Sequence, residues 1–234
     1  MENGRTGLVL VPGLLCDAQL YWPQVAALSD VANVTVADMT GSASLGEMAE
    51  AVLEATPGRF ALAGLSMGGY VCFEVWRRAP ERVAALALLD TSARPDTSEQ
   101  TARRLRFVET ARRVGLDPVL DELWPIVVAP SRHDDGALRR IFDSMAHHLG
   151  PDVFARQQDA IIERPDSRGD LALIAVPTLV VCGRDDAVTP LEVNQEMATG
   201  IAGAEIVVVD DCGHLATLER PEVVNAALRA WLVA

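Results

Sequence analysis

The sequence is short of positive charge. Its 234 residues include 20 Lys and Arg against 33 Asp and Glu, so the formal net charge at pH 7 is −13. Nucleic acids and anionic membrane surfaces attract proteins through basic patches, so this balance argues against both as partners. Acidity indicates little more than this, because an acidic surface also keeps a protein soluble.

Long hydrophobic runs and export signals are also lacking. The first residues, from Met1 to Arg5, form no basic segment, and the apolar run at 8–11 stops at Pro12. That run is too short for a signal peptide or a membrane span. We therefore expect a cytoplasmic protein that does not bind membranes.

Cysteine is scarce, and its spacing matches no metal-binding pattern. The four cysteines are Cys16, Cys72, Cys182 and Cys212. They form no C-x-x-C pair and no zinc spacing, and disulfides are not expected in a chain without an export signal. The sequence implies no metal and no dissociable cofactor.

What the sequence does have is enough apolar material for one core. Half of the residues are hydrophobic and 23% are charged, as in ordinary globular domains. Short β-branched runs alternate with helix-length segments, which is the pattern of a parallel sheet covered on both faces. Strands are predicted at 7–11, 33–37, 60–65, 85–89, 178–182 and 205–209. Helices are predicted at 18–28, 44–56, 67–79, 190–200 and 221–232.

One long stretch breaks this alternation. Between residues 92 and 176 only helical segments are found, at 97–114, 118–128, 134–149 and 152–163. A helical insertion between the fourth and fifth strands would cover the carboxyl ends of the strands, where ligands bind in open α/β sheets. The predicted organisation is a core of residues 1–91 and 177–234, with a helical lid formed by residues 92–176.

The motif Gly-Leu-Ser-Met-Gly at 64–68 carries the predicted chemistry. A sharp strand-to-helix turn holds a nucleophilic serine in strained geometry, and the flanking positions need glycine because side chains there would clash. The pattern alone would arise by chance in about one chain in ten of this size. It stands here between a predicted strand and a predicted helix, and this context supports Ser66 as the nucleophile.

A serine nucleophile needs a base that accepts its proton. Three of the four histidines, His133, His147 and His148, lie in the predicted lid. His214 instead follows the last predicted strand, on a loop at its carboxyl end. It is therefore the predicted base.

The third member of such a site is a carboxylate that holds the histidine tautomer. The loop after the fifth predicted strand offers Asp185 and Asp186, and Asp90 ends the fourth. The residues themselves leave this choice open. The chain order serine, aspartate, histidine is the one expected for this kind of fold.

Four segments together resemble the α/β-hydrolase superfamily, especially its lidded bacterial esterases, enol-lactonases and carbon–carbon bond hydrolases. They are the Val-Pro-Gly-Leu-Leu run at 11–15, the motif at 64–69, the loop at 183–190, and the stretch at 212–221. The resemblance covers nearly the whole chain and implies Asp186 as the acid. It also implies an oxyanion hole formed by the backbone N–H groups of Leu14 and Met67.

The sequence departs from that family pattern in two places. Many relatives carry His-Gly in the first loop, where this chain has Pro12 and Gly13. The first strand also begins near residue 7, which leaves no room for two leading antiparallel strands. We therefore predict a reduced sheet of about six strands, mostly or wholly parallel, with helices on both faces. The edge left exposed could favour a homodimer.

These features predict a serine hydrolase that cleaves a small to medium carboxylic ester or lactone through an acyl-enzyme intermediate. The expected partner is a small ester-like molecule. Candidate pocket residues are Leu15, Trp22, Phe107, Trp124 and Met145. A carbon–carbon bond hydrolase, an enol-lactonase, a thioesterase and a non-catalytic ligand receptor remain as alternatives, because one fold serves many functions.

Basic residues cluster in the first predicted lid helix. They are Arg103, Arg104, Arg106, Arg112 and Arg113. A solvated helix face is one interpretation of this cluster. The other is a site that attracts an acidic substrate or an acyl carrier.

Overall fold

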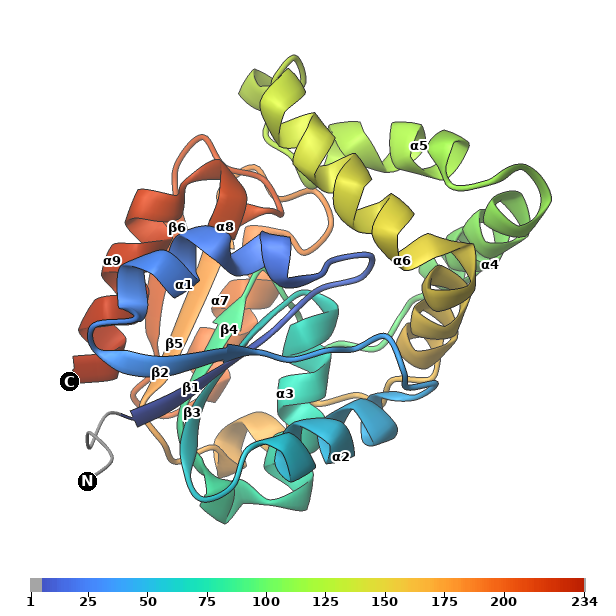
Figure 1. The fold of residues 1–234 in the computed structure, drawn as a ribbon. Helices are drawn as coiled ribbons and strands as arrows, with labels where there is room; N and C mark the ends of the chain where they lie inside the picture. The colour runs from blue at the N-terminus through green and yellow to red at the C-terminus, as the bar shows by residue number, and fades with distance from the viewer. Residues whose placement is uncertain (1–5, 234) are drawn as a thin grey trace.

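The computed structural model describes residues 6–233 and contains one six-stranded sheet (Figure 1). The strands are β1 (Thr6–Val11), β2 (Ala32–Val36), β3 (Phe60–Leu65), β4 (Val83–Leu89), β5 (Thr178–Gly183) and β6 (Glu205–Val209). They lie in the order β2-β1-β3-β4-β5-β6, and every neighbouring pair is parallel. The predicted reduced, parallel sheet is therefore confirmed.

Both faces of the sheet are buried, which explains the continuous apolar runs of its strands. In β1, Leu8 and Leu10 belong to the core on one face, whereas Val9 and Val11 belong to the core on the other. Successive side chains of a strand point to opposite faces, so a strand covered on both sides needs apolar residues at every position.

Helices cover each face (Figure 1). Those of one face are α1 (Trp22–Leu28), α8 (Ala216–Glu219) and α9 (Pro221–Val233). Those of the other are α2 (Leu45–Ala55), α3 (Met67–Arg78) and α7 (Leu191–Gly200). Four short 3₁₀ turns join the elements: η1 (Ala18–Tyr21), η2 (Pro80–Arg82), η3 (Pro130–Arg132) and η4 (Arg168–Leu173). The helix predicted at 18–28 is thus divided, because η1 precedes α1 and Pro23 stands in the first turn of α1.

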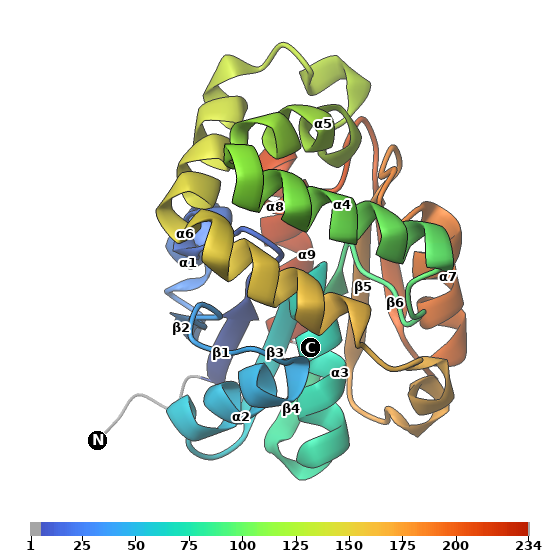
Figure 2. The ribbon, with the colours of Figure 1, turned by 90° about the vertical axis from the view of Figure 1, so that its right-hand side faces the viewer.

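Three helices separate β4 from β5 and cap one end of the molecule (Figures 1 and 2). They are α4 (Ser98–Val114), α5 (Asp117–Val127) and α6 (Gly136–Ile162), and we call them the helical insertion. The two helices predicted at 134–149 and 152–163 are both present as the two halves of α6, which meet at a kink where Gly150 has non-helical backbone angles, with a φ of 79°. The division into a core of residues 1–91 and 177–234 and a lid of residues 92–176 stays a prediction.

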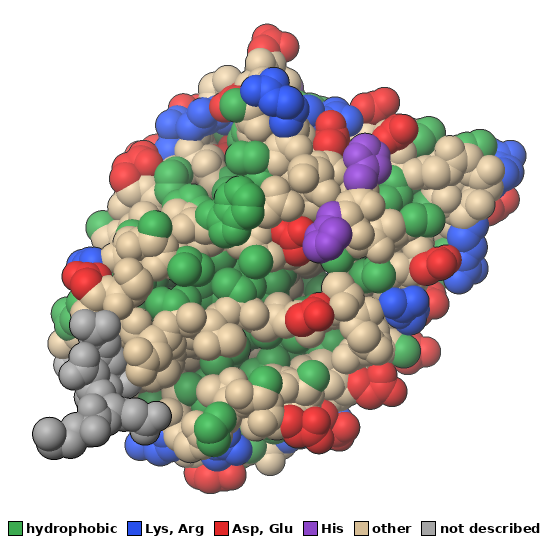
Figure 3. Space-filling view, in the orientation of Figure 1, with side chains coloured by type: hydrophobic (Ala, Val, Ile, Leu, Met, Phe, Trp, Pro, Cys, Tyr) green, Lys and Arg blue, Asp and Glu red, His purple; other side chains and the backbone are tan. Residues whose placement is uncertain are grey.

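The strand β2 lies at one edge of the sheet. Apolar side chains are visible on the face around α1 and β2 (Figure 3), and Val34 and Val36 of β2 are half-buried. The homodimer predicted for this edge remains a prediction. Among the described residues, no helix combines the length and the apolar character that crossing a bilayer requires. Residues 1–5, which bear on the predicted lack of an export signal, lie outside the described residues.

Candidate active site

Ser66 occupies the turn between β3 and α3. Its φ of 55° lies in the left-handed region, which residues other than glycine rarely adopt. Its N–H donates to the Leu89 carbonyl at 3.0 Å, and its own carbonyl accepts from Thr91 Oγ1 at 2.7 Å. Bonds to β4 and to the segment after it therefore hold the backbone of Ser66 in this strained conformation.

Glycine is required on both sides of Ser66. A Cβ atom added to Gly64 would lie 2.3 Å from the Gly68 carbonyl oxygen, and one added to Gly68 would lie 2.0 Å from the Val11 carbonyl oxygen. Both distances are far below van der Waals contact. The clash expected from the sequence is therefore confirmed, and it explains the spacing of the motif.

His214 and Asp186 form a buried pair. His214 Nδ1 lies 2.8 Å from Asp186 Oδ2, and both side chains are almost wholly buried. Thr189 Oγ1 donates to the same oxygen at 2.7 Å. The backbone N–H groups of Val188 and Thr189 donate to Asp186 Oδ1 at 2.7 and 2.9 Å. The loop after β5 thus fixes the carboxylate against the imidazole ring.

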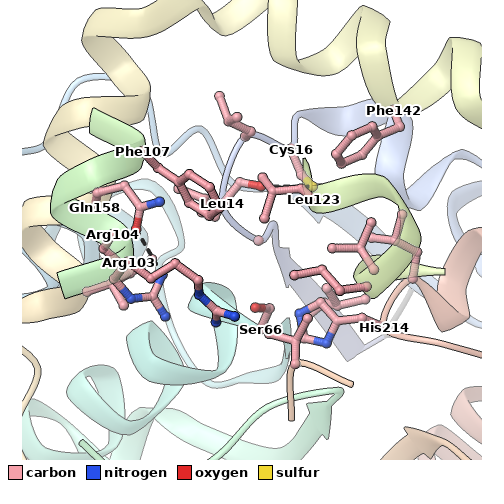
Figure 4. Close-up of a pocket in the computed structure, with 18 of the residues that line it drawn as sticks. Leu14, Cys16, Ser66, Arg103, Arg104, Phe107, Leu123, Phe142, Gln158 and His214 are labelled. Carbon is pink, nitrogen blue, oxygen red and sulfur yellow. Dashed lines mark hydrogen bonds between the residues drawn. The ribbon is translucent and has the colours of Figure 1, made fainter. Parts of the chain in front are cut away.

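Ser66 and His214 line one cavity of about 70 Å³ (Figure 4). Its walls are mostly apolar and come from the loop after β1, the turn after β3, the helical insertion and the loop after β6. The residues that line it include Gly13, Leu14, Leu15, Cys16, Leu65, Tyr70, Arg103, Arg104, Phe107, Leu123, Ile126, Val127, Phe142, Gln158, Ile161, Val188 and Leu215. A serine hydroxyl and a histidine supported by a carboxylate therefore meet in a small apolar site.

The loop after β1 lies directly against the turn that carries Ser66. A Cβ atom added to Gly13 would be 3.4 Å from the Ser66 Cβ atom. Leu14 lines the cavity, and Met67 is the buried first residue of α3. The two residues predicted for the oxyanion hole thus come from the two segments that meet beside Ser66.

Comparison with known proteins agrees with this architecture. Residues 8–227 match the sequence model of the alpha/beta hydrolase family. The chain belongs to this family. The resemblance inferred from the sequence motifs is therefore confirmed.

Individual members of the alpha/beta hydrolase family are similar over most of the chain. A solved structure of a thermophilic esterase from Thermogutta terrifontis, with malate bound, is 33% identical with a TM-score of 0.90, covering 98% of this chain and 90% of that one. A pimeloyl-[acyl-carrier protein] methyl ester esterase from Nitrosomonas europaea is 28% identical over 187 residues, 76% of this chain and 73% of that protein. A relative from Agrobacterium fabrum, provisionally named carbamate hydrolase RutD, is 25% identical over 254 residues, 99% of this chain and 96% of that protein.

Among the described residues, neither of the other carboxylates weighed as acids is hydrogen-bonded to His214. Asp185 is exposed. Asp90 is fully buried, and it accepts from the N–H groups of Gly183 at 2.9 Å and Ala216 at 3.2 Å. Burial, and then the nearby charge of Asp186, hold the pKa of the Asp90 carboxyl well above its usual range. Asp90 therefore joins the loops that carry Asp186 and His214.

Glu219 is a buried carboxylate that the sequence analysis did not single out. Its Oε1 accepts from the N–H groups of Gly213 at 3.0 Å and Leu215 at 3.2 Å, on either side of His214. Its Oε2 accepts from Ala129 N–H at 2.8 Å, in the helical insertion. Burial raises the pKa of this carboxyl. The only sequence signal was its place five residues after His214, in the stretch that carried the family resemblance.

Three of the five predicted pocket residues do not line the cavity, whereas Leu15 and Phe107 do. Trp22 is 59% exposed at the start of α1 and faces solvent. Trp124 and Met145 are buried within the helical insertion, where Trp124 stacks at 5.7 Å on Phe142. The prediction for these three was wrong because their helices turn them toward solvent or toward neighbouring helices.

Cys16 also lines the cavity and is a second potential nucleophile by position. Burial raises the pKa of its thiol to about 12, so it carries almost no reactive thiolate at neutral pH. All four cysteines are free and buried. Within residues 6–233, no cluster of three or more His, Cys, Asp or Glu side chains could hold a metal ion.

Proposed function

We propose that this protein is a serine hydrolase that cleaves carboxylic esters, with Ser66 as nucleophile, His214 as base and Asp186 as acid. The observation that carries the proposal is the meeting of Ser66 and His214 in one cavity, with His214 Nδ1 held 2.8 Å from Asp186 Oδ2. This arrangement leaves His214 Nε2 for proton exchange with the serine hydroxyl.

In the first half of the reaction, Ser66 Oγ attacks the ester carbonyl carbon while its proton passes to His214 Nε2. Asp186 accepts the Nδ1–H bond and stabilises the positive imidazolium. The carbonyl oxygen becomes negative, and the backbone N–H groups of Leu14 and Met67 donate to it. The bond to the alcohol oxygen then breaks, and the alcohol leaves with the proton from Nε2.

In the second half, water attacks the acyl carbon bound to Ser66. His214 Nε2 takes a proton from the water and returns it to Ser66 Oγ as the carboxylic acid departs. The products are one acid and one alcohol, and the protein regains its starting protonation. Every step of this scheme uses side chains and backbone groups of the chain itself.

An ester is the substrate class best supported among the reactions of this family. The thermophilic esterase is 33% identical over nearly the whole chain, and a second relative carries a methyl ester esterase name. The cavity is small and mainly apolar, which fits a short to medium acyl group. Leu15 and Phe107 are proposed to contact that group.

Reaction with a fluorophosphonate probe tests the proposal. We expect a single adduct, located by mass spectrometry on Ser66 and absent from the Ser66→Ala variant, because only an activated serine attacks the probe at neutral pH. Iodoacetamide added to the folded protein should leave Cys16 unmodified, since the pKa of its thiol is about 12. A series of p-nitrophenyl esters would then define the preferred acyl length.

A folded protein that gives neither an adduct nor hydrolysis of p-nitrophenyl acetate would contradict the proposal. Circular dichroism of the wild type and of Ser66→Ala is the control for folding. Stoichiometric ligand binding without turnover would then favour a receptor built on the same fold.

A further inference from the structure

The cavity beside Ser66 has one charged end. Its lining includes Arg103 and Arg104 from α4 and Gln158 from α6, whereas no Asp or Glu is among the described residues that line it. This is unusual for a chain that carries 33 acidic residues against 20 basic ones. The same two arginines line a neighbouring cavity of about 130 Å³, which also has no acidic residue in its described lining.

Arg104 is paired with other side chains of the protein. Its Nε donates to Asp96 Oδ2 at 2.7 Å and its Nη1 donates to Gln158 Oε1 at 2.8 Å. The other oxygen of Asp96 accepts from Arg164 Nη1 at 2.5 Å. Both oxygens of Asp96 therefore already pair with a guanidinium, one with Arg104 and the other with Arg164.

Arg103, unlike Arg104, has no side-chain partner among the described residues. Within the described residues it forms no ion pair or side-chain hydrogen bond, although Arg106 on the same helix pairs with Glu122 at 2.9 Å. Figure 4 shows its guanidinium group extending from α4 toward Ser66. A guanidinium is a positively charged group with five N–H donors and no acceptor, so Arg103 adds an unpaired positive charge to the lining of the cavity.

The local balance of charge favours an incoming anion. Arg103, Arg104 and Arg164 all line the neighbouring cavity, and the carboxylate of Asp96 pairs with two of them, Arg104 and Arg164. Their mutual repulsion is relieved when a negative group binds near Arg103. The planar fork of a guanidinium binds a carboxylate through two parallel bonds, and such charge-assisted bonds are among the strongest available to a side chain.

We propose that the substrate carries a carboxylate besides its ester bond, and that Arg103 binds this carboxylate while Ser66 attacks the ester. The apolar side chains that line the same cavity would then contact a short hydrocarbon linker. A half-ester of a dicarboxylic acid has this form. The inference rests on the proposed ester hydrolysis for its setting, but its test does not require turnover.

Binding to Ser66→Ala, which cannot form an acyl-enzyme, is the first measurement. Calorimetry would compare monomethyl glutarate with the neutral dimethyl glutarate at about 0.15 M salt, where long-range attraction is screened. We expect the half-ester to bind about tenfold to a hundredfold more tightly, the range of a charge-assisted pair. Adding Arg103→Gln should remove that preference, and Arg103→Lys should restore part of it.

Arg112→Gln is the matched control, because Arg112 is an exposed arginine of the same helix that does not line the cavity. It should leave the preference unchanged. Equal affinity for the two esters, or the same loss in both glutamine variants, would overturn the inference. An ester of equal length that ends in phosphate distinguishes the anion, since tighter Arg103-dependent binding of the phosphate would overturn the assignment to a carboxylate.

Turnover separates the two proposals. If the wild type hydrolyses both esters with equal kcat/KM and Arg103→Gln changes neither, the ester hydrolase stands and the carboxylate site fails. If the half-ester binds through Arg103 but neither ester is cleaved and the fluorophosphonate probe finds no target, the carboxylate site stands and the hydrolase fails.

Discussion

Both carboxylate oxygens of Asp186 accept hydrogen bonds. Oδ1 accepts two backbone N–H groups, and Oδ2 faces both Thr189 Oγ1 and His214 Nδ1. An ionised carboxylate suits this position, because it only accepts hydrogen bonds and each of these neighbouring groups has a proton to donate. The consequence is a defined tautomer of His214, with the proton on Nδ1 and a lone pair on Nε2.

Replacing Asp186 with Asn should abolish most of the activity while leaving the fold intact. The amide NH₂ can face His214 Nδ1 as a donor, which places the ring proton on Nε2 and prevents it from accepting the Ser66 proton. We expect kcat to fall by roughly 10³-fold to 10⁴-fold, as an Asp-to-Asn change at this role does elsewhere. The measurement is ester hydrolysis together with the rate of fluorophosphonate labelling.

Asp185→Asn is the control for Asp186→Asn, because it removes the same charge from an exposed neighbour in the same loop. It should retain nearly full activity. Equal losses in the two variants would indicate an effect of the loop or of net charge, and Asp186 would lose its assigned role.

Single residues also show how far the sequence could predict the site. Ser66 directly follows β3 and His214 lies on the loop after β6, so both are expected at the same end of the sheet. Asp90 and Glu219 each bond to a residue far away in sequence: Gly183 is 93 residues from Asp90, and Ala129 is 90 residues from Glu219. Bonds over such separations depend on how loops pack, which no local pattern encodes.

At the scale of elements, the helical insertion is attached to both loops that flank the cavity. His214 N–H donates to the Val127 carbonyl at 3.0 Å, at the end of α5. On the other side, Leu15 N–H donates to Gln157 Oε1 of α6 at 2.9 Å. The insertion therefore helps to shape the site as well as to cover it, and its contacts converge on the residues beside Ser66 and His214.

Glu219→Gln should weaken the link between the insertion and the loop of His214. An amide has one acceptor oxygen, so either Ala129 N–H or the pair of N–H groups at Gly213 and Leu215 would face an NH₂ group. A buried donor without an acceptor costs about 1–3 kcal/mol. We expect a lower free energy of unfolding in urea and a lower kcat.

Glu109→Gln is the matched control for this prediction, because Glu109 is exposed on α4. It should change neither quantity measurably. If Glu219→Gln behaves like this control, the buried carboxylate does not hold the His214 loop in place.

Some features of the helices could be predicted from the sequence, and others could not. The break predicted near Gly150 is present within α6, because Gly150 adopts a positive φ that ends the first helix and Pro151 stands at the start of the second. Trp22 was expected in the pocket, yet it faces solvent because the preceding η1 turn sets the rotation of α1. Helical periodicity identifies a helix and its two faces, but not the direction in which each face points.

At the scale of the whole molecule, the architecture was the most predictable feature. Six continuous apolar runs indicated a sheet buried on both faces, and β1 shows why, since its alternate residues enter separate cores. That Arg103 would be left without a partner could not be predicted from the sequence. Five arginines appear alike in the α4 sequence, and only packing decides that Arg104 and Arg106 find carboxylates.

Asp90 should make the stability of the whole molecule depend on pH. It is buried directly after β4 and bonds to Gly183 at the end of β5 and to Ala216 after β6. Burial raises its pKa in the folded protein above the value near 3.9 of an unfolded chain. Between these two pKa values the folded state binds one more proton than the unfolded state. The free energy of unfolding therefore falls as pH rises through this window, by at most about 1.4 kcal/mol per pH unit from this group.

Asp90→Asn should remove that dependence, because an amide does not titrate. The variant loses one acceptor for Gly183 or Ala216 N–H, so it should be less stable than the wild type at pH 5. The deficit should shrink or reverse toward pH 8, where keeping the wild-type carboxyl protonated costs the most. Urea unfolding at pH 5, 6, 7 and 8 measures this, with Asp185→Asn as the control for net charge. Parallel curves for wild type and Asp90→Asn would mean that the buried carboxyl has the same proton affinity in both states, contrary to the effect expected from its burial beside Asp186.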